Sequence, residues 1–245
     1  MMARPRLSLL AMALCAAISA QAVAQDEPKE AALKDVNHPQ LRSFRTVTAG
    51  LDAFDQYHQM APAVAALRFR VRPRGTSADA VTLSIVGDGE PVAVALDADG
   101  SFAIARSKAA YEDNAKLVFT PPDARLSTIA DIRTPGVPAN ARRLGDLRLE
   151  CKVNLAVIKK EIPFLARAVV NTFLFTGDWC SKLPMFLSLP QDKRLRKATL
   201  VFEDRRRELT RDEVVNGYKS PMLDPAWPDD SLLELELEAD APPNE

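Results

Sequence analysis

Histidines, cysteines and clustered carboxylates are the usual components of catalytic and metal sites, and this sequence holds few of them in a useful arrangement. Its two histidines are His38, in a charged N-terminal stretch, and His58, near the end of a predicted helix. Neither lies in a motif of zinc peptidases, serine hydrolases, phosphate-binding loops or dinucleotide-binding turns. We therefore predict no catalytic residue, no metal ligand and no cofactor. Because carboxylates are plentiful and pair only in space, a carboxylate-based hydrolase acting on glycans is the alternative.

Cys151 and Cys180 are the two cysteines that remain once a predicted signal segment is removed. An even number of cysteines in an exported protein favours a disulfide, which here would close a loop of about 30 residues. Two buried free thiols are the alternative. A redox-active pair is not expected, because the two residues form no C-x-x-C motif.

Two rows of like charge recur at the two-residue spacing of a β-strand. Like charges on one face repel unless opposite charges face them. We hypothesise that each row meets opposite charge, either from the other row across a sheet or from elsewhere; two independent solvated faces are the alternative. The rows are Arg68, Arg70 and Arg72, and Glu234, Glu236 and Glu238.

Tyr218 and Trp227 belong to a proline-spaced segment, 218–228, that cannot form a helix. Their rings either pack on the body of the protein or contact a partner. Together with the arginine row, they are the partner-binding residues that the sequence predicts. Basic clusters on either side of residues 198–203 indicate a solvated hairpin, or alternatively contact with anionic lipid or polysaccharide.

Residues 1–24 have the features of a secretory signal peptide. Arg4 and Arg6 precede a short apolar run, and Ala22-Val23-Ala24 is typical of a cleavage site. Cleavage would leave 30 of the 32 lysines and arginines against 33 acidic residues, a net charge near −3. That balance excludes bulk attraction to nucleic acid, and no later stretch is long enough for a transmembrane span. We expect a periplasmic or secreted protein of Gram-negative type.

Strand-like and helix-like periodicities follow a predicted flexible lead-in at residues 25–40. Three- and four-residue apolar steps predict a helix over 41–62. The clearest two-residue alternation, Leu147–Val157, predicts a principal strand. Residues 161–175 favour a helix, with a strand as the alternative. Other strands are expected at 65–71, 81–86, 92–96, 102–104, 116–120, 127–132, 185–189, 198–203 and 231–238.

The segment V-A-V-A-L-D-A-D-G-S-F-A-I, residues 92–104, carries one family resemblance. An Asp-x-Asp-Gly turn followed by a phenylalanine and an aliphatic residue resembles a hairpin of carboxypeptidase-regulatory-like, prealbumin-like domains. The matching residues are Asp97, Asp99, Gly100, Phe102 and Ile104. The resemblance covers about 30 residues and implies an accessory β-sandwich rather than an activity. The other ligands of a calcium loop are absent, so the two aspartates indicate a plain turn.

These patterns predict a mainly β protein: an antiparallel β-sandwich of one or two units with two accessory helices. The expected divisions are 1–24 signal peptide, 25–40 lead-in, 41–62 helix, 63–158 β-sandwich domain and 159–240 a second β-rich part with one helix. The second part is either separate from the first or continuous with it. We expect a non-enzymatic envelope or extracellular module that binds a protein or glycan; a hydrolase and a structural subunit of an envelope complex are the alternatives.

Overall fold

A computed structural model describes residues 41–73, 80–121, 126–161, 180, 195–210, 213 and 224–237. The predictions for the signal peptide, the lead-in, residues 162–175 and 185–189, and Tyr218 lie outside these residues.

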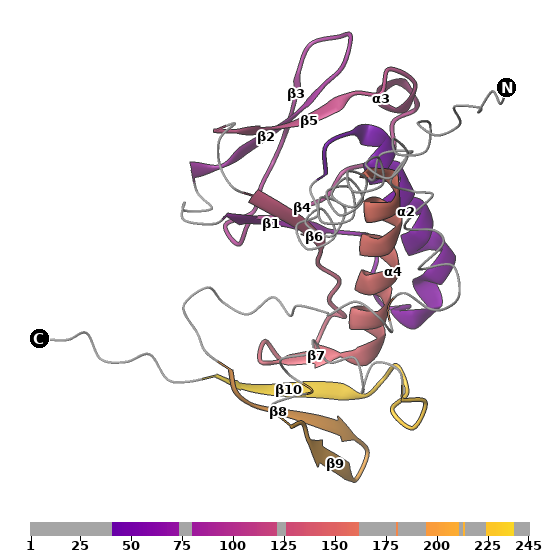
Figure 1. The fold of residues 1–245 in the computed structure, drawn as a ribbon, viewed down its shortest axis with the longest axis vertical. Helices are drawn as coiled ribbons and strands as arrows, with labels where there is room; N and C mark the ends of the chain where they lie inside the picture. The colour runs from indigo at the N-terminus through magenta and orange to yellow at the C-terminus, as the bar shows by residue number, and fades with distance from the viewer. Residues whose placement is uncertain are drawn as a thin grey trace, which may run out of the picture.

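Ten strands form three antiparallel sheets in this part of the chain, so the protein is mainly β, as predicted (Figure 1). The first sheet contains β4 (Ser101–Phe102), β1 (Phe69–Pro73) and β6 (Leu126–Ala130), in that order. The second contains β3 (Val92–Val94), β2 (Thr82–Val86) and β5 (Lys116–Thr120). The third contains β7 (Ala141–Arg143), β10 (Leu232–Leu237), β8 (Leu195–Phe202) and β9 (Arg205–Glu208).

Several predicted strands match the observed strands closely. β5 coincides with the predicted strand, and β2, β8 and β10 differ from theirs by one to three residues at an end. The turn predicted between Asp97 and Gly100 forms, with the Gly100 amide donating to the Asp97 carbonyl at 2.8 Å, but the predicted hairpin is wrong, because β3 and β4 on either side of the turn belong to different sheets. Gly100 has a φ of 75°, a left-handed conformation that explains a glycine at this position.

Three α-helices accompany the sheets in the described residues: α2 (Phe44–Tyr57), α3 (Lys108–Glu112) and α4 (Leu144–Glu161). A short 3-10 helix, His58–Met60, continues from α2. The predicted helix at 41–62 is therefore confirmed. It begins after Ser43, whose hydroxyl accepts a hydrogen bond from the Thr46 amide as an N-cap.

The predicted principal strand at Leu147–Val157 is wrong, because these residues form the middle of α4. Leucine, arginine, glutamate, lysine and alanine all favour helices, Asp146 lies in the first turn, and Lys159 and Lys160 lie in the last. The two-residue alternation arose because α4 is buried on more than one side. Leu147 packs into one core, and Leu149 and Val153 pack into another.

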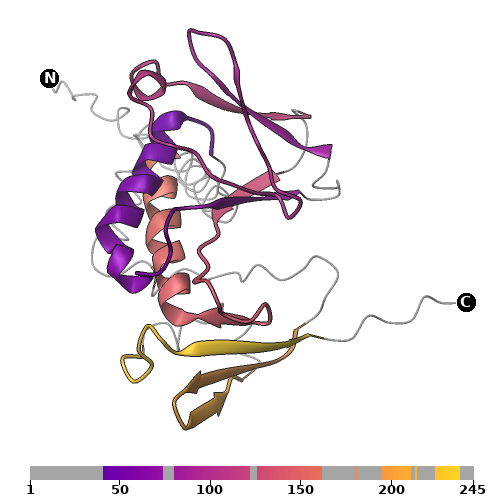
Figure 2. The same ribbon diagram turned by 180° about the vertical axis from the view of Figure 1, so that it is seen from behind.

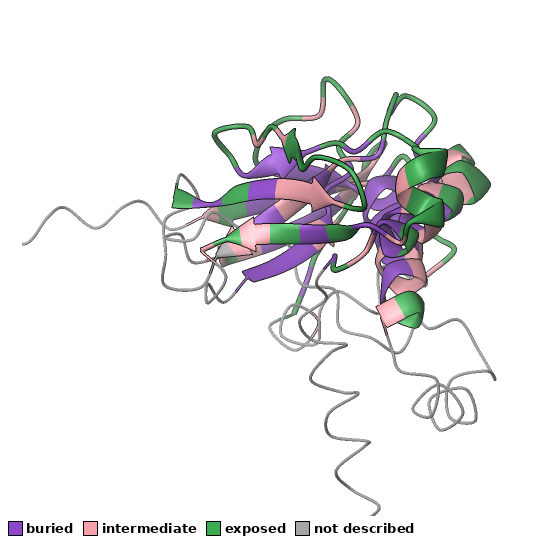
Figure 3. Cartoon of the chain, turned by 90° about the horizontal axis from the view of Figure 1, so that it is seen from above, coloured by how far each residue is buried: buried purple, intermediate pink, exposed green. Residues whose placement is uncertain are grey.

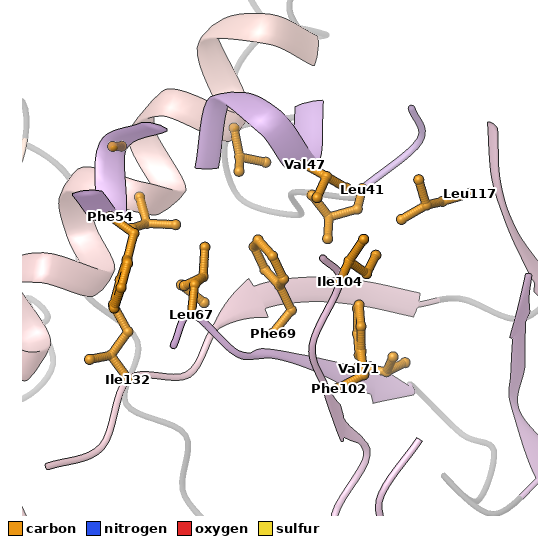
Figure 4. Packing of buried hydrophobic residues seen from close by; sticks show 14 of the residues in the cluster. Leu41, Val47, Phe54, Leu67, Phe69, Val71, Phe102, Ile104, Leu117 and Ile132 are labelled. Carbon is orange, nitrogen blue, oxygen red and sulfur yellow. The ribbon is translucent and has the colours of Figure 1, made fainter. Parts of the chain in front are cut away.

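The larger core lies between the pair of helices α2 and α4 and the sheets beside them. Figures 1 and 2 show the two helices side by side in both views, on one side of β1 and β6. Figure 4 shows Val47 and Phe54 of α2 facing Leu67, two residues before β1, and Phe69 of β1, and all four side chains are almost fully buried.

The smaller core lies under the four-stranded sheet and includes Leu144 and Leu147 of α4 with Leu200 of β8 and Leu233 of β10. Figure 3 shows buried residues gathered between the strands and the helices, with exposed residues on the outside. α4 therefore contributes to both cores. The predicted domain boundary at residues 158–159 falls inside this helix, and β7, from the first predicted part, pairs with β10 from the second.

Gly145 lies where α4 begins, and its neighbours leave no room for a side chain. A Cβ there would clash with the Met60 carbonyl oxygen and with Nη1 of Arg143, and would lie 2.9 Å from the Cβ of Asp229. We expect Gly145→Ala to destabilise the protein by about 1–3 kcal/mol through overpacking, measured by urea unfolding. Gly89→Ala is the matched control, because a Cβ at Gly89 meets no atom within 4 Å. Equal stability of the two variants would contradict this prediction.

Candidate functional site

A cavity of about 390 Å³ lies where the first sheet, the loop after β6, the start of β7 and the first turn of α4 meet. Three arginines line it, one from each of β1, the loop after β6 and β7. We call this site the arginine pocket. Its polar lining residues are Arg70, Arg133, Arg142, Asp99, Thr134 and Asp146, and the rest of the lining is Val137, Pro138, Ala139 and Ala141.

Arg70 is held in position by two carboxylates. On β1 it lies between Ser101 of β4 and Ile129 of β6 in the sheet register. Its Nε and Nη2 donate to Oδ2 of Asp131 at 3.1 and 2.6 Å, and Nη2 also reaches Oδ2 of Asp99 at 2.7 Å. Because one edge of the guanidinium is fixed in this way, Arg70 is pre-oriented at the pocket wall.

Asp131 connects Arg70 to Arg133. Its Oδ1 accepts from Nε of Arg133 at 3.1 Å, while its Oδ2 accepts from Arg70. Burial on its own would raise the pKa of Asp131, but Arg133 and Arg70 more than offset burial, so its pKa lies below the ordinary value. Asp131 is therefore ionised at neutral pH and serves to orient the two arginines.

Arg142, which lines the pocket, forms a buried ion pair with Glu150. Nη2 of Arg142 donates to Oε1 of Glu150 at 2.5 Å and to the carbonyl of Ile132 at 3.0 Å, and the Ile132 amide donates to the same Oε1 at 2.7 Å. Burial raises the pKa of Glu150, an effect that Arg142 opposes. Burial lowers the pKa of Arg142, but Glu150 and Asp131 reverse this effect, so its guanidinium stays charged.

Asp146 fixes the opposite wall of the pocket. Its Oδ2 accepts from the Thr134 amide at 2.7 Å and its Oδ1 accepts from the Thr134 hydroxyl at 2.6 Å. The carboxylate lies in the first turn of α4, where the helix dipole favours negative charge. These contacts hold the loop after β6 against the start of α4, and both residues line the pocket.

The carboxylate acceptors of the pocket are already hydrogen-bonded within the protein, whereas some of its arginine donors are not. Both oxygens of each of Asp99, Asp131 and Asp146 accept at least one hydrogen bond from the protein. In contrast, Nε of Arg142 is buried without a hydrogen-bond partner. Within the described ranges, the terminal nitrogens of Arg133 donate to no protein acceptor, and neither does Nη1 of Arg70. The pocket therefore presents spare N–H donors, which suit a ligand rich in oxygen acceptors.

The predicted arginine row meets opposite charge, but not from the glutamate row. Arg68 pairs with Asp97, and Arg70 pairs with Asp99 and Asp131. For Arg68 and Arg70 the proposed pairing with the glutamate row is wrong, since both pair with aspartates and β10 lies in a different sheet; Glu238 lies outside the described residues.

On β10, Glu234 instead pairs with Arg206 of the neighbouring hairpin at 2.5 Å. Of the predicted partner-binding arginines, Arg70 lines the pocket, whereas Arg68 lies outside it. Arg72 is partly buried, and burial lowers its pKa despite the nearby charge of Glu150.

Trp227 packs on the body of the protein, one of the two arrangements that the sequence left open. It is 6% exposed and belongs to the core under the four-stranded sheet. The Arg205 guanidinium lies 5.1 Å from the centre of its ring and 5.2 Å from that of Phe202, a cation–π arrangement that covers the indole.

The predicted disulfide between Cys151 and Cys180 forms, with a Cα–Cα distance of 5.8 Å. It attaches α4 to a point 29 residues further along the chain. His58 makes a structural contact, since its Nε2 lies 2.7 Å from the Val64 carbonyl and its ring packs on Phe54. His38 lies outside the described residues.

Sequence reasoning did not find Arg133, Arg142, Asp131 and Asp146. One local signal was available: Asp131 and Arg133 flank the buried Ile132 at strand spacing, so both point to the same side. Arg142 gave no such signal, because its role depends on α4 bringing Glu150 next to β7.

The described part of the chain offers no candidate site of another kind. The described residues contain no group of three or more His, Cys, Asp or Glu side chains arranged to hold a metal ion. Among the helices that the structure describes, none combines the length and apolarity needed to cross a membrane. Comparison of the chain with protein-family models, with curated proteins and with solved structures found no match.

Proposed function

We propose that the protein is an exported, non-enzymatic module that binds a glycan in the arginine pocket. One observation carries this proposal: Arg70, Arg133 and Arg142 line one cavity, in which Arg70 and Arg133 have spare guanidinium N–H groups and the carboxylates already accept hydrogen bonds. A cavity of about 390 Å³ is within the range of small-ligand sites. Sugars offer many oxygen acceptors in a small volume, which fits this set of donors.

The surroundings of the pocket favour a glycan over a protein partner. Protein interfaces usually rely on aromatic or apolar anchors. The large apolar side chains that are exposed in the described part of the chain, Val92, Tyr111 and Val118, belong to β3, α3 and β5 and do not line the pocket. All three residues of β7 are buried, so this edge is not open to an added peptide strand.

The carboxylates near the pocket do not favour the hydrolase alternative. A glycosidase needs one carboxyl group with a raised pKa as the acid and a second that faces the substrate. Glu150 has a raised pKa but is buried against Arg142, and both oxygens of Asp131 are engaged by arginines. Binding without bond cleavage is therefore the function that this arrangement supports best.

Two features support export as part of this proposal. The Cys151–Cys180 disulfide is of the kind that persists in oxidising compartments. The N-terminal residues have the pattern of a signal peptide, as described above.

A glycan array probed with the purified exported protein tests the proposal. We expect binding to a limited set of oligosaccharides, weakened about 10- to 100-fold by Arg133→Gln, because each charge-assisted hydrogen bond contributes about 1.5–3 kcal/mol. Arg106→Gln is the matched control: Arg106 is an exposed arginine that pairs with Asp52 and Asp55 and does not line the pocket. Absence of any glycan binding would refute the proposal, and release of new reducing ends from a bound glycan would support the hydrolase instead.

A further inference from the structure

We infer that the arginine pocket selects glycans that carry a carboxylate, such as uronic-acid oligosaccharides, over their neutral counterparts. This inference rests on the proposed glycan-binding function and adds the charge of the sugar that the pocket takes.

Arg142 is a buried arginine with unused hydrogen-bonding capacity. Its side chain is 4% exposed, yet Nε has no hydrogen-bond partner, and within the described ranges only Nη2 donates to the protein. A buried charged donor that lacks an acceptor is rare in native proteins, because the lost hydration is not repaid. No ligand in the pocket can reach this Nε, but an anionic group bound there would offset the charge of the buried guanidinium, which lines the pocket.

Arg133 has the geometry that a carboxylate ligand requires. Its Nε is fixed by Asp131 at 3.1 Å, so the orientation of the guanidinium plane is set by the protein. Its side chain is 38% exposed, and its two terminal nitrogens remain available at the pocket among the described residues. Two parallel N–H donors on one planar group match the two oxygens of a carboxylate, which is the preferred pairing of arginine.

The acidic side chains of the pocket cannot serve as acceptors for the spare arginine donors. Asp99 is held by Arg70 and the Ser101 amide, and Asp146 by Thr134. Asp131 and Glu150 lie behind the arginines and are engaged by them. The pocket and the residues next to it hold nearly equal numbers of acidic and basic side chains, so net charge does not attract the ligand. Selectivity for a carboxylate comes from directed donors in a partly enclosed site.

A peptide could offer the same carboxylate, but the pocket lacks what a peptide also requires. The buried β7 edge and the absence of a large exposed apolar side chain at the pocket, among the described residues, leave a peptide backbone without partners. We therefore place the carboxylate on a sugar, and a peptide with a free C-terminus serves as a competing probe.

The experiment is calorimetric titration of the full exported protein with galacturonate, glucuronate and mannuronate oligosaccharides and with the methyl ester of each. The ester keeps the sugar and removes only the negative charge. We expect at least one acid to bind tenfold or more tightly than its ester. This preference should vanish in Arg133→Gln and shrink in Arg133→Lys, which keeps the charge without the planar pair of donors. Arg106→Gln should retain the preference.

Two kinds of failure can be told apart. Equal binding of acids and esters, or tighter binding of neutral sugars, would overturn the carboxylate inference and leave the glycan-binding proposal standing. If no sugar binds, here or on the array, the proposed function fails and the inference fails with it. If the competing probe, a peptide with a free C-terminus, binds and no sugar does, the proposed function and the carboxylate inference are both overturned. Circular dichroism of each variant identifies any that lose affinity through unfolding.

Discussion

Replacing Arg142 with leucine is expected to destabilise the protein by about 3–5 kcal/mol, the cost of leaving a buried charge without its partner. Glu150 would stay buried, and the Ile132 carbonyl would lose the same donor. The change is measured as the shift in the urea unfolding midpoint, followed by circular dichroism.

A double-mutant cycle separates the contribution of the ion pair to the free energy of unfolding from that of side-chain packing. Glu150→Leu combined with Arg142→Leu removes both charges, and we expect the double variant to recover much of the stability lost in the single variant. Arg206→Gln is the control for an exposed pair, since Arg206 and Glu234 are both substantially exposed, and it should cost no more than about 1 kcal/mol. A cost below 1 kcal/mol for Arg142→Leu would show that the pair is not buried as described.

Replacing both Cys151 and Cys180 with alanine is expected to destabilise the protein by about 3.5 kcal/mol. A cross-link that spans 29 residues restricts the unfolded chain, and its removal restores that conformational entropy. Urea unfolding under oxidising conditions measures the difference between the variant and the original protein.

The same comparison under reducing conditions is the control for the disulfide. Reduction should lower the free energy of unfolding of the original protein until it approaches that of the double alanine variant. It should not change the free energy of unfolding of the variant itself. Titration of thiols in the unfolded, unreduced protein should detect neither Cys151 nor Cys180. Two reactive thiols in that assay, or equal stability of the two proteins, would count against the disulfide.

Short strands bounded by turns were the part of the fold most open to prediction. β2 and β5 each bury one side against the core, and Asp97–Gly100 carries its own turn chemistry, so the local sequence and the fold agree. In α4 they conflict. A helix that packs on two sides has no single apolar stripe, and its buried residues, such as Leu147 and Leu149, fell by chance at alternate positions.

The candidate site was predictable only in part, for a related reason. The arginine row pointed to Arg70, whose strand spacing is visible in the sequence. The other two pocket arginines come from a loop and from a three-residue strand, and neither element has a periodic pattern. Their convergence depends on β7 pairing with β10, which is about 90 residues further along the chain, and this pairing leaves no local signature.

The placement of α4 has a consequence for how the molecule melts. Leu144 and Leu147 belong to one apolar cluster, and Leu149 and Val153, within the next turn or two of the same helix, belong to the other. Neither cluster can unfold without disturbing α4, and the packing of the other cluster depends on the same helix. The sheets at the two ends of the protein are therefore coupled into one cooperative unit, even though they share no strand.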